Sequence, residues 1–387
     1  MAWNIGANDT ANAMGSSVGA KAITYKQAVV IASILTLVGA TFIGSHVTDT
    51  ISKGIVDPVL IQDPKVISIG FISALLASGL WVTFATWKSW PISTTHSIVG
   101  GLIGFGLIYG GKDAVNWTKI GEIALSWITS PLFSGILAFI IFKFIVKFVF
   151  KSRNRKKAAA IISPFFIIFT VAIIFFSLIF KTKLGSLLQG WKFLIALSVA
   201  MVTILSFWLW NRELTKKVGK VESIFRRLQL MTAAYMALSI GANDVANAIG
   251  PIATIYSINM TGEVGSKVSV PIWILAFGGI GIALGISTWG YRVMKTIGER
   301  ITKLSNTRSF TIQFSAATSV LLASKLGMPV STTHAVVGAV VGIGLAKGLD
   351  ALDLRVVKNI LYSWVLTVPV TALLTIPVYL GLTKLFK

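Results

Sequence analysis

The chain has 387 residues, of which 55% are hydrophobic and 12% are charged, and its mean hydropathy is +0.81. Soluble domains carry about 25% charged residues, so this composition excludes an ordinary soluble fold and indicates a protein that lies in a membrane. The absence of cysteine from the sequence also excludes a disulfide framework, a thiolate metal site and a cysteine nucleophile.

Apolar stretches of about 20 residues recur from end to end, for example residues 161–180, IISPFFIIFTVAIIFFSLIF. Each stretch is long enough to cross the hydrocarbon core as a helix, whereas a transmembrane barrel would show short alternating segments. We therefore predict an all-α polytopic membrane protein with about 12 spans or hairpin arms.

The formal net charge of +22 comes largely from three basic blocks between apolar stretches, at 143–157, 212–227 and 292–308. Basic loops beside membrane spans are typical of the cytoplasmic side. We interpret the charge as a topology signal and expect no nucleic-acid partner.

Residues 1–20 lack a basic segment followed by an apolar core, so no cleavable signal peptide is expected.

The first predicted helix carries GANDTANA, Gly6 to Ala13, and only five residues precede it, so we expect this end to be shortened or incomplete. Asn8, Asp9 and Asn12 share one helix face because they are spaced three and four residues apart. A carboxylate inside a membrane indicates a functional site. Together with amide oxygens it suits a hard cation, although the asparagines could also simply join helices.

A helical hairpin is predicted within 65–118, with PISTTH, Pro91 to His96, at or near its tip. Proline followed by hydroxyl residues and a glycine-spaced apolar stretch predicts a helix N-terminus buried in the membrane. The free N–H groups and the helix dipole favour an anion there. The candidate oxyanion ligands are Ser93, Thr94 and Thr95, with an ordinary helix cap as the alternative. His96 could donate to an anion, relay a proton or only pack.

Both motifs recur in the second part of the chain, as GANDVANA, Gly241 to Ala248, and PVSTTH, Pro329 to His334. The equivalent candidate residues for the cation are Asn243, Asp244 and Asn247. Those for the oxyanion are Ser331, Thr332 and Thr333, followed by His334. We predict a first repeat at 1–154, a two-helix insert with basic cytoplasmic loops at 155–227, and a second repeat at 228–387.

The loops of the two repeats differ in charge. The loop at 45–64 holds three aspartates and one lysine and is expected to be external, whereas the equivalent loop at 291–308 is basic and expected to be internal. Equivalent loops on opposite sides indicate two inverted-topology repeats, in which helical hairpins and broken helices form a shared binding site near mid-membrane.

The doubled GANDxANA and doubled P-[IV]-S-T-T-H motifs resemble those of the inorganic phosphate transporter (PiT) family of cation-coupled phosphate symporters. The resemblance implies a phosphate carrier of the cell membrane that works by alternating access and is not an enzyme. It assigns transported sodium ions or protons to Asp9, Asn12, Asp244 and Asn247, and phosphate to the Ser/Thr runs. Sodium is favoured because the amide oxygens would have no role in simple protonation.

Three alternatives remain at this point: proton coupling, an intramembrane enzyme acting on a lipid phosphate, and a passive anion channel. The enzyme would need a nucleophile or metal together with an arginine in mid-span, and the sequence offers neither. A channel would leave the two aspartates without a role. The sequence leaves open whether the chain forms a homo-oligomer.

Overall fold

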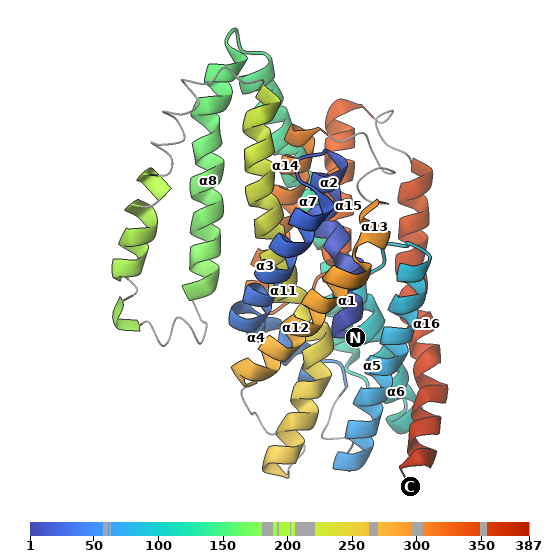
Figure 1. Ribbon diagram of the computed structural model, residues 1–387. Coiled ribbons are helices and arrows are strands. Elements are labelled where there is room, and N and C mark those ends of the chain that lie inside the picture. The colour runs from blue at the N-terminus through green and yellow to red at the C-terminus, as the bar shows by residue number, and fades with distance from the viewer. Residues whose placement is uncertain are drawn as a thin grey trace.

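The computed structural model describes residues 1–56, 61, 63–179, 189–191, 193–201, 203–205, 221–262, 270–295, 305–348 and 354–386. Within these ranges the regular structure is helical, apart from an isolated bridge between Val56 and Val115. Figure 1 shows an elongated helical bundle with the insert helices at one side.

The helices of the first half are α1 (Ala2–Thr10), the π-helix η1 (Ala11–Gly15), α2 (Ser16–Gly19), α3 (Tyr25–Ile43), α4 (Ser45–Lys53), α5 (Pro64–Trp87), α6 (Thr94–Gly110), α7 (Trp117–Ile145) and the π-helix η3 (Val146–Phe150). The insert holds α8 (Arg155–Ile179) and the short turn η4 (Gln189–Trp191). The second half contains α11 (Val221–Thr261), α12 (Ile272–Trp289), α13 (Tyr291–Lys295), α14 (Asn306–Lys325), α15 (Thr332–Lys347) and α16 (Leu354–Leu385).

Part of the expected external loop at 45–64 is helical. Residues Ser45–Lys53 form α4, because Val47 and Ile51 lie four positions apart and bury their side chains against the bundle. Residues 57–60 and 62 of this loop lie outside the described residues.

Six helices among the described residues are long and apolar enough to cross a membrane: Tyr25–Ile43, Pro64–Trp87, Trp117–Phe150, Arg155–Ile179, Ile272–Trp289 and Ile360–Leu385. By contrast, α6 and α15 have only 17 and 16 residues. The sequence prediction of an all-α polytopic membrane protein is therefore confirmed at this level, and the finer count of about 12 spans or hairpin arms remains an expectation.

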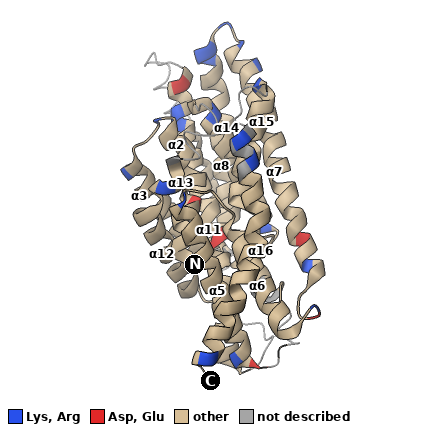
Figure 2. Cartoon of the chain, turned by 90° about the vertical axis from the view of Figure 1, so that its right-hand side faces the viewer, with Lys and Arg blue, Asp and Glu red and all other residues tan. Residues whose placement is uncertain are grey.

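The two GAND helices run in opposite directions. In Figure 1, α1, η1 and α2 rise from the N-terminus at mid-height, whereas α11 descends from its yellow-green start near the top to its yellow end at the bottom. Figure 2 shows most Lys and Arg positions toward the end of the bundle where α2, α14 and α15 are labelled. This distribution agrees with the interpretation of the net charge as a topology signal.

Glycines allow close contact between helices of the two halves. A Cβ on Gly100 of α6 would lie 2.4 Å from the carbonyl oxygen of Val368 in α16, and one on Gly338 of α15 would lie 2.2 Å from that of Pro131 in α7. Gly100 and Gly338 occupy the same position after their STTH motifs, and each contacts a long helix of the other half. In this sense the two contacts are reciprocal. The glycine-rich stretches are thus packing surfaces, as small residues commonly are between membrane helices.

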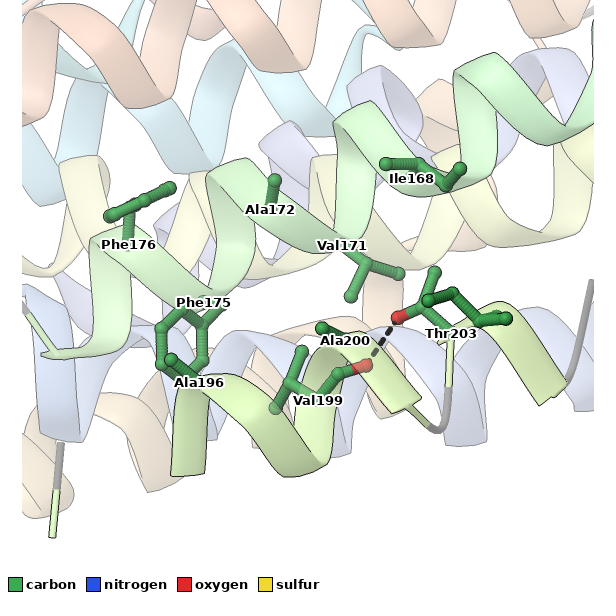
Figure 3. Close-up of a pocket in the computed structure, with 10 residues that line it drawn as sticks. Ile168, Val171, Ala172, Phe175, Phe176, Ala196, Val199, Ala200 and Thr203 are labelled. Atoms are coloured by element: carbon green, nitrogen blue, oxygen red, sulfur yellow. Dashed lines mark hydrogen bonds between the residues drawn. The ribbon is translucent and has the colours of Figure 1, made fainter. Parts of the chain in front are cut away.

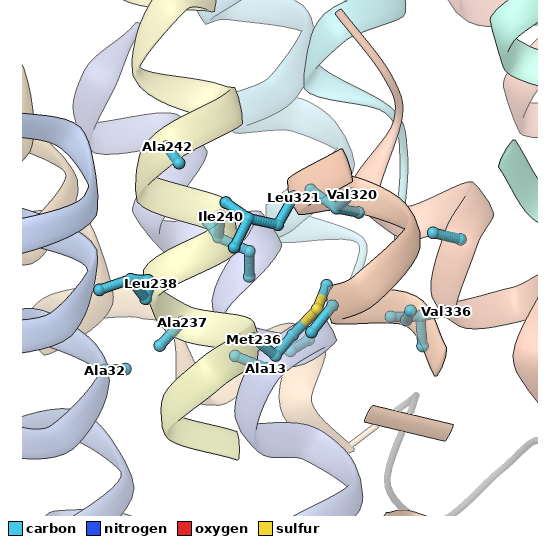
Figure 4. Packing of buried hydrophobic residues seen from close by; sticks show 14 of the residues in the cluster. Ala13, Ala32, Met236, Ala237, Leu238, Ile240, Ala242, Val320, Leu321 and Val336 are labelled. Atoms are coloured by element: carbon cyan, nitrogen blue, oxygen red, sulfur yellow. The ribbon is translucent and has the colours of Figure 1, made fainter. Parts of the chain in front are cut away.

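The largest buried apolar cluster joins helices from both halves. Figure 4 shows Ala13 of η1 and Ala32 of α3 against Met236 and Leu238 of α11, with Val320 of α14 nearby. Because this core contains side chains from both halves of the chain, neither half buries its apolar surface alone, and the motif helices are held within one packed unit.

The insert is packed differently. Figure 3 shows α8 beside the helical residues 193–201 and 203–205, and between them lies a groove of about 350 Å³ whose lining is almost entirely apolar. Val171, Phe175 and Val199 are among its lining residues. No candidate site residue lies in this groove, so the site has to be sought in the packed centre.

Candidate functional site

The structure brings all twelve candidate residues of the two motif pairs into the buried centre of the bundle. Each side chain is at most 2% exposed. They are Asn8, Asp9 and Asn12 from α1 and η1, Asn243, Asp244 and Asn247 from α11, Ser93, Thr94 and Thr95 at the start of α6, and Ser331, Thr332 and Thr333 at the start of α15.

The Asp9 carboxylate accepts hydrogen bonds from both halves of the protein. Thr94 Oγ1 donates to Oδ2 at 2.7 Å, while Thr333 Oγ1 and Asn12 Nδ2 donate to Oδ1 at 3.4 and 3.1 Å. A carboxylate has about four acceptor sites, so both of its oxygens retain capacity for a further ligand.

The Asp244 carboxylate has partners from its own half. Thr332 Oγ1 donates to Oδ2 at 3.2 Å and Asn243 Nδ2 donates to Oδ1 at 2.7 Å. The Thr332 contact is the counterpart of the Thr94 contact to Asp9, so each STTH motif uses its first threonine to bind the aspartate of its own half.

Asn12 and Asn247 link each GAND helix to the STTH motif of the other half. Asn12 Nδ2 donates to the hydroxyls of Thr332 and Thr333 at 3.2 and 3.0 Å, and Asn247 Nδ2 donates to those of Thr94 and Thr95 at 3.4 and 3.1 Å. Asp9, Asn12, Thr332 and Asp244 are consequently joined in one continuous hydrogen-bond chain.

The carbonyl oxygens of the same two asparagines have no hydrogen-bond partner. Oδ1 of Asn12 and Oδ1 of Asn247 are buried acceptors without a donor in the described structure. An unsatisfied buried acceptor costs about 1–3 kcal/mol, so a partner is expected for each of them. Each oxygen belongs to a residue in direct contact with the hydroxyl network, and a cation would supply the missing positive partner.

Asn8 and Asn243 have a positioning role that the sequence did not predict. Asn8 donates to Thr86 Oγ1 at 2.9 Å and accepts from the Ile92 N–H at 3.3 Å. In the second half, Asn243 accepts from Ser324 Oγ at 3.3 Å and from the Val330 N–H at 3.4 Å. Their carbonyl oxygens thus hold the segment before each STTH motif. Thr86 and Ser324 occupy equivalent positions in the two halves. This equivalence is the sequence signal that could have identified the two hydroxyl partners of Asn8 and Asn243.

Ser93 and Ser331 are the N-caps of α6 and α15. Their hydroxyl oxygens accept from the N–H groups of His96 and His334 at 3.1 and 3.2 Å. The prediction that these residues begin buried helices is confirmed, and the cap leaves each hydroxyl hydrogen able to donate to another group.

The second threonines join the two STTH segments directly. Thr95 Oγ1 donates to the carbonyl of Val330 at 3.2 Å, and the single hydrogen of Thr333 Oγ1 is shared between the Ile92 carbonyl at 3.0 Å and Asp9 Oδ1 at 3.4 Å. Because each motif bonds to the residue ahead of the other motif's serine, the N-termini of α6 and α15 are brought close to one another.

His96 and His334 lie buried in the first turns of α6 and α15. Their Nδ1 atoms lie 3.2 and 3.1 Å from the carbonyl oxygens of Trp364 and Trp127, and their ring centroids are 4.5 Å apart. His96 also packs on Trp127, and His334 on Trp364, with centroids 3.7 and 3.4 Å apart. The rings are therefore packed reciprocally, while the Nε2 atom of each histidine is buried without a hydrogen-bond partner in the described structure.

The chemistry of the site is that of oxygen ligands and neutral donors. Within the described part of the chain, no three His, Cys, Asp or Glu side chains gather as a transition-metal site would require. Two carboxylates, two free amide oxygens and a group of hydroxyls instead suit a hard cation. The cap hydroxyls and the ends of α6 and α15 could donate to an oxyanion, whereas the threonine hydroxyls already donate to carboxylates and carbonyls in this structure.

The fold and this buried, doubly acidic centre define a multi-pass membrane protein of the transporter class. Residues 5–375 match the phosphate transporter family. The chain therefore belongs to the phosphate transporter family, a family of transporters and not of enzymes, and it transports phosphate.

Relatives cover nearly the whole chain. A protein of Thermococcus kodakarensis named as a phosphate permease is 50% identical over 379 residues, covering 97% of this chain and 93% of the relative. The chloroplastic inorganic phosphate transporter 2-1 of Arabidopsis thaliana is 39% identical over 414 residues, covering 97% and 69%. A solved structure described as the sodium-dependent phosphate transporter matches with a TM-score of 0.90 and 44% identity, covering 99% of this chain and 96% of that one.

Proposed function

We propose that this phosphate transporter is a sodium-coupled symporter that works by alternating access in the cell membrane. The observation that carries the proposal is the single hydrogen-bond network that contains both buried carboxylates and the hydroxyls of both STTH motifs. The similar solved structure is that of a sodium-dependent phosphate transporter.

The cation ligands are the carboxylates of Asp9 and Asp244 and the free amide oxygens of Asn12 and Asn247. These groups are buried, and the two amide oxygens lack partners. A proton would satisfy a carboxylate but would leave both amide oxygens unpaired, whereas a sodium ion can bind the two kinds of oxygen together. The carbonyl oxygens of Asn8 and Asn243 accept hydrogen bonds from backbone N–H groups, so these two residues position the ligands.

The phosphate ligands are the hydroxyls of Ser93, Thr94 and Thr95 and of Ser331, Thr332 and Thr333, together with the N-termini of α6 and α15. Neutral donors and helix ends stabilise an oxyanion without a fixed positive side chain. Such a site binds phosphate well enough to select it but weakly enough to release it.

Coupling follows from the charges. A phosphate anion beside Asp9 and Asp244 would be repelled by two buried carboxylates, and bound sodium ions would reverse that repulsion. Import of each negative charge against an interior-negative potential costs roughly 2.3 kcal/mol per 100 mV, and cotransported cations offset it. One sodium ion for each carboxylate gives two for each phosphate.

The two halves are proposed to be inverted-topology repeats, with the hairpins α5–α6 and α14–α15 entering the membrane from opposite sides. The opposite directions of α1–α2 and α11 and the reciprocal contacts of Asn12 and Asn247 support this arrangement. Alternating access would then move one set of elements against the other around the shared site.

The test is uptake of labelled phosphate into vesicles that contain the purified protein, with sodium and proton gradients imposed separately. The proposal expects an inward sodium gradient to drive accumulation at matched pH. Accumulation driven by the proton gradient alone would establish proton coupling instead, and uptake that ignores both gradients would indicate a passive anion pathway.

A further inference from the structure

The helices that lead into the two STTH motifs are equivalent in position but differ in chemistry. With the motifs aligned, Gln313 of α14 corresponds to Leu75 of α5, and Ser309 corresponds to Phe71. The α5 helix has the composition of a membrane span, whereas α14 carries buried polar side chains at every second position, which are distributed around the helix. These are Thr307, Ser309, Thr311, Gln313 and Ser315.

Gln313 connects α14 to the elements that follow the first GAND motif. Its Nε2 donates to the carbonyl of Ala13 and, at 3.0 Å, to Ser17 Oγ. Its Oε1 accepts from Thr232 Oγ1 of α11 at 3.3 Å. Gln313 is 0% exposed, and the carbonyl that it contacts belongs to the residue directly after Asn12, so it lies near the proposed cation site without contacting its ligands.

The polar contacts continue away from the site. Gln229 Nε2 and Ser309 Oγ both donate to the carbonyl of Ser16, at 3.2 and 3.1 Å. Gln229 Oε1 and Ser16 Oγ are nevertheless buried without a partner. Two unsatisfied polar atoms beside one carbonyl are costly in a dry contact and would be satisfied once water entered it.

These polar contacts, which run from Gln313 to Gln229 and Ser16, lead toward the basic end of the bundle. Arg226 Nε donates to the carbonyl of Ala22 at 3.0 Å, just beyond α2, and Lys21 beside it is exposed. Figure 2 shows most Lys and Arg positions at this end. A positive potential at the mouth of a polar pathway attracts an anion such as phosphate.

We propose that the contact of α14 with η1, α2 and the start of α11 is the passage through which phosphate and its cations move between the central site and the basic face, and that Gln313 closes it in this conformation. The proposal rests on the proposed function, since it assumes that the central site holds these ions. Separation of α14 from α2 would free the amides and hydroxyls of Gln313, Gln229 and Ser17 to hydrate passing ions.

The first test is cysteine accessibility, for which the natural absence of cysteine provides a clean background. Gln313→Cys and Ser17→Cys are labelled in transporting vesicles with a membrane-impermeant anionic methanethiosulfonate, and Leu75→Cys is the matched control at the equivalent position. We expect both test sites to react from the basic face at least about tenfold faster than the control. Equal rates at all three sites, or labelling only from the opposite face, would overturn the proposal.

The second test separates passage from binding. Gln313→Leu introduces the residue found at the equivalent position of α5 and removes every amide contact. We expect the sodium-dependent Kd for phosphate to stay within about twofold of wild type while the uptake rate falls about tenfold. An unchanged uptake rate, or an equal loss of affinity and rate, would contradict a passage role. Failure of the wild-type protein to couple uptake to sodium would instead refute the proposed function itself.

Discussion

The two carboxylates at the centre of the molecule are equivalent in sequence but differ in their hydrogen bonds. Asp9 accepts from Thr94 of its own half and from Thr333 of the other half, whereas the donors to Asp244, Thr332 and Asn243, belong to its own half. Repeated motifs therefore build one shared network with two unequal positions. Cations held at the two positions should accordingly differ in affinity.

The largest expected effect is loss of a carboxylate. Asp9→Asn and Asp244→Asn should each lower sodium-driven phosphate uptake about a hundredfold or more, because a buried charge that pairs with a bound ion is removed. Asp9→Asn should also weaken phosphate binding more than Asp244→Asn, because the Asp9 carboxylate positions threonines of both motifs, Thr94 and Thr333. Uptake and calorimetric binding measure these effects, with Glu122→Gln at the exposed Lys119–Glu122 ion pair as the control. Wild-type coupling in both aspartate variants would contradict the cation assignment.

Loss of the first threonine hydroxyl comes next. Thr94→Val and Thr332→Val should each weaken phosphate binding about tenfold, because each change deletes a donor and leaves an asparagine N–H without its acceptor. Thr41→Val is a matched control, since its hydroxyl donates to the Leu37 carbonyl within α3, away from both motifs. Equilibrium binding at saturating sodium gives the affinities, and unaltered values in both test variants would exclude the hydroxyls from the phosphate site.

A smaller effect is expected from tightening the packing around the shared site. Gly100→Ala and Gly338→Ala place a methyl group against a neighbouring backbone and should each lower stability by about 1–3 kcal/mol. Because the two contacts are reciprocal, the two losses should be similar. Thermal unfolding in detergent measures them, and Gly381→Ala, which has no neighbouring atom within 4 Å of the added Cβ, is the control. Unequal losses would indicate that the two glycine contacts are packed differently, although the two glycines are equivalent in sequence.

The smallest expected effect concerns the helix caps. Ser93→Ala and Ser331→Ala should each cost about 1 kcal/mol of stability, the usual value of a serine N-cap. Phosphate affinity should fall by about twofold, because the hydroxyl hydrogen remains free to donate in the wild type. Thermal unfolding and binding together separate the two roles, and an unchanged affinity would leave these serines as caps alone.

Much of this centre follows from sequence because the informative residues are repeated. The doubled Asp, Asn and Thr positions mark both half-sites, and the serine before each helix predicts its cap. The pairing of His96 with Trp364 could not be predicted, since nothing local links residues so far apart in the chain. The role of Gln313 was not predicted either, because the equivalent residue of α5 is not polar. The polar sequence of α14 nevertheless distinguishes this helix from a membrane span.

The most direct measurement counts ions for each phosphate. Labelled sodium and labelled phosphate are followed into the same protein-containing vesicles at clamped voltage, which gives the ratio of the two initial fluxes. A pocket built from two acidic half-sites predicts two sodium ions carried with each phosphate. A ratio of one, or phosphate entry with no accompanying sodium, would contradict the assignment of one cation to each carboxylate.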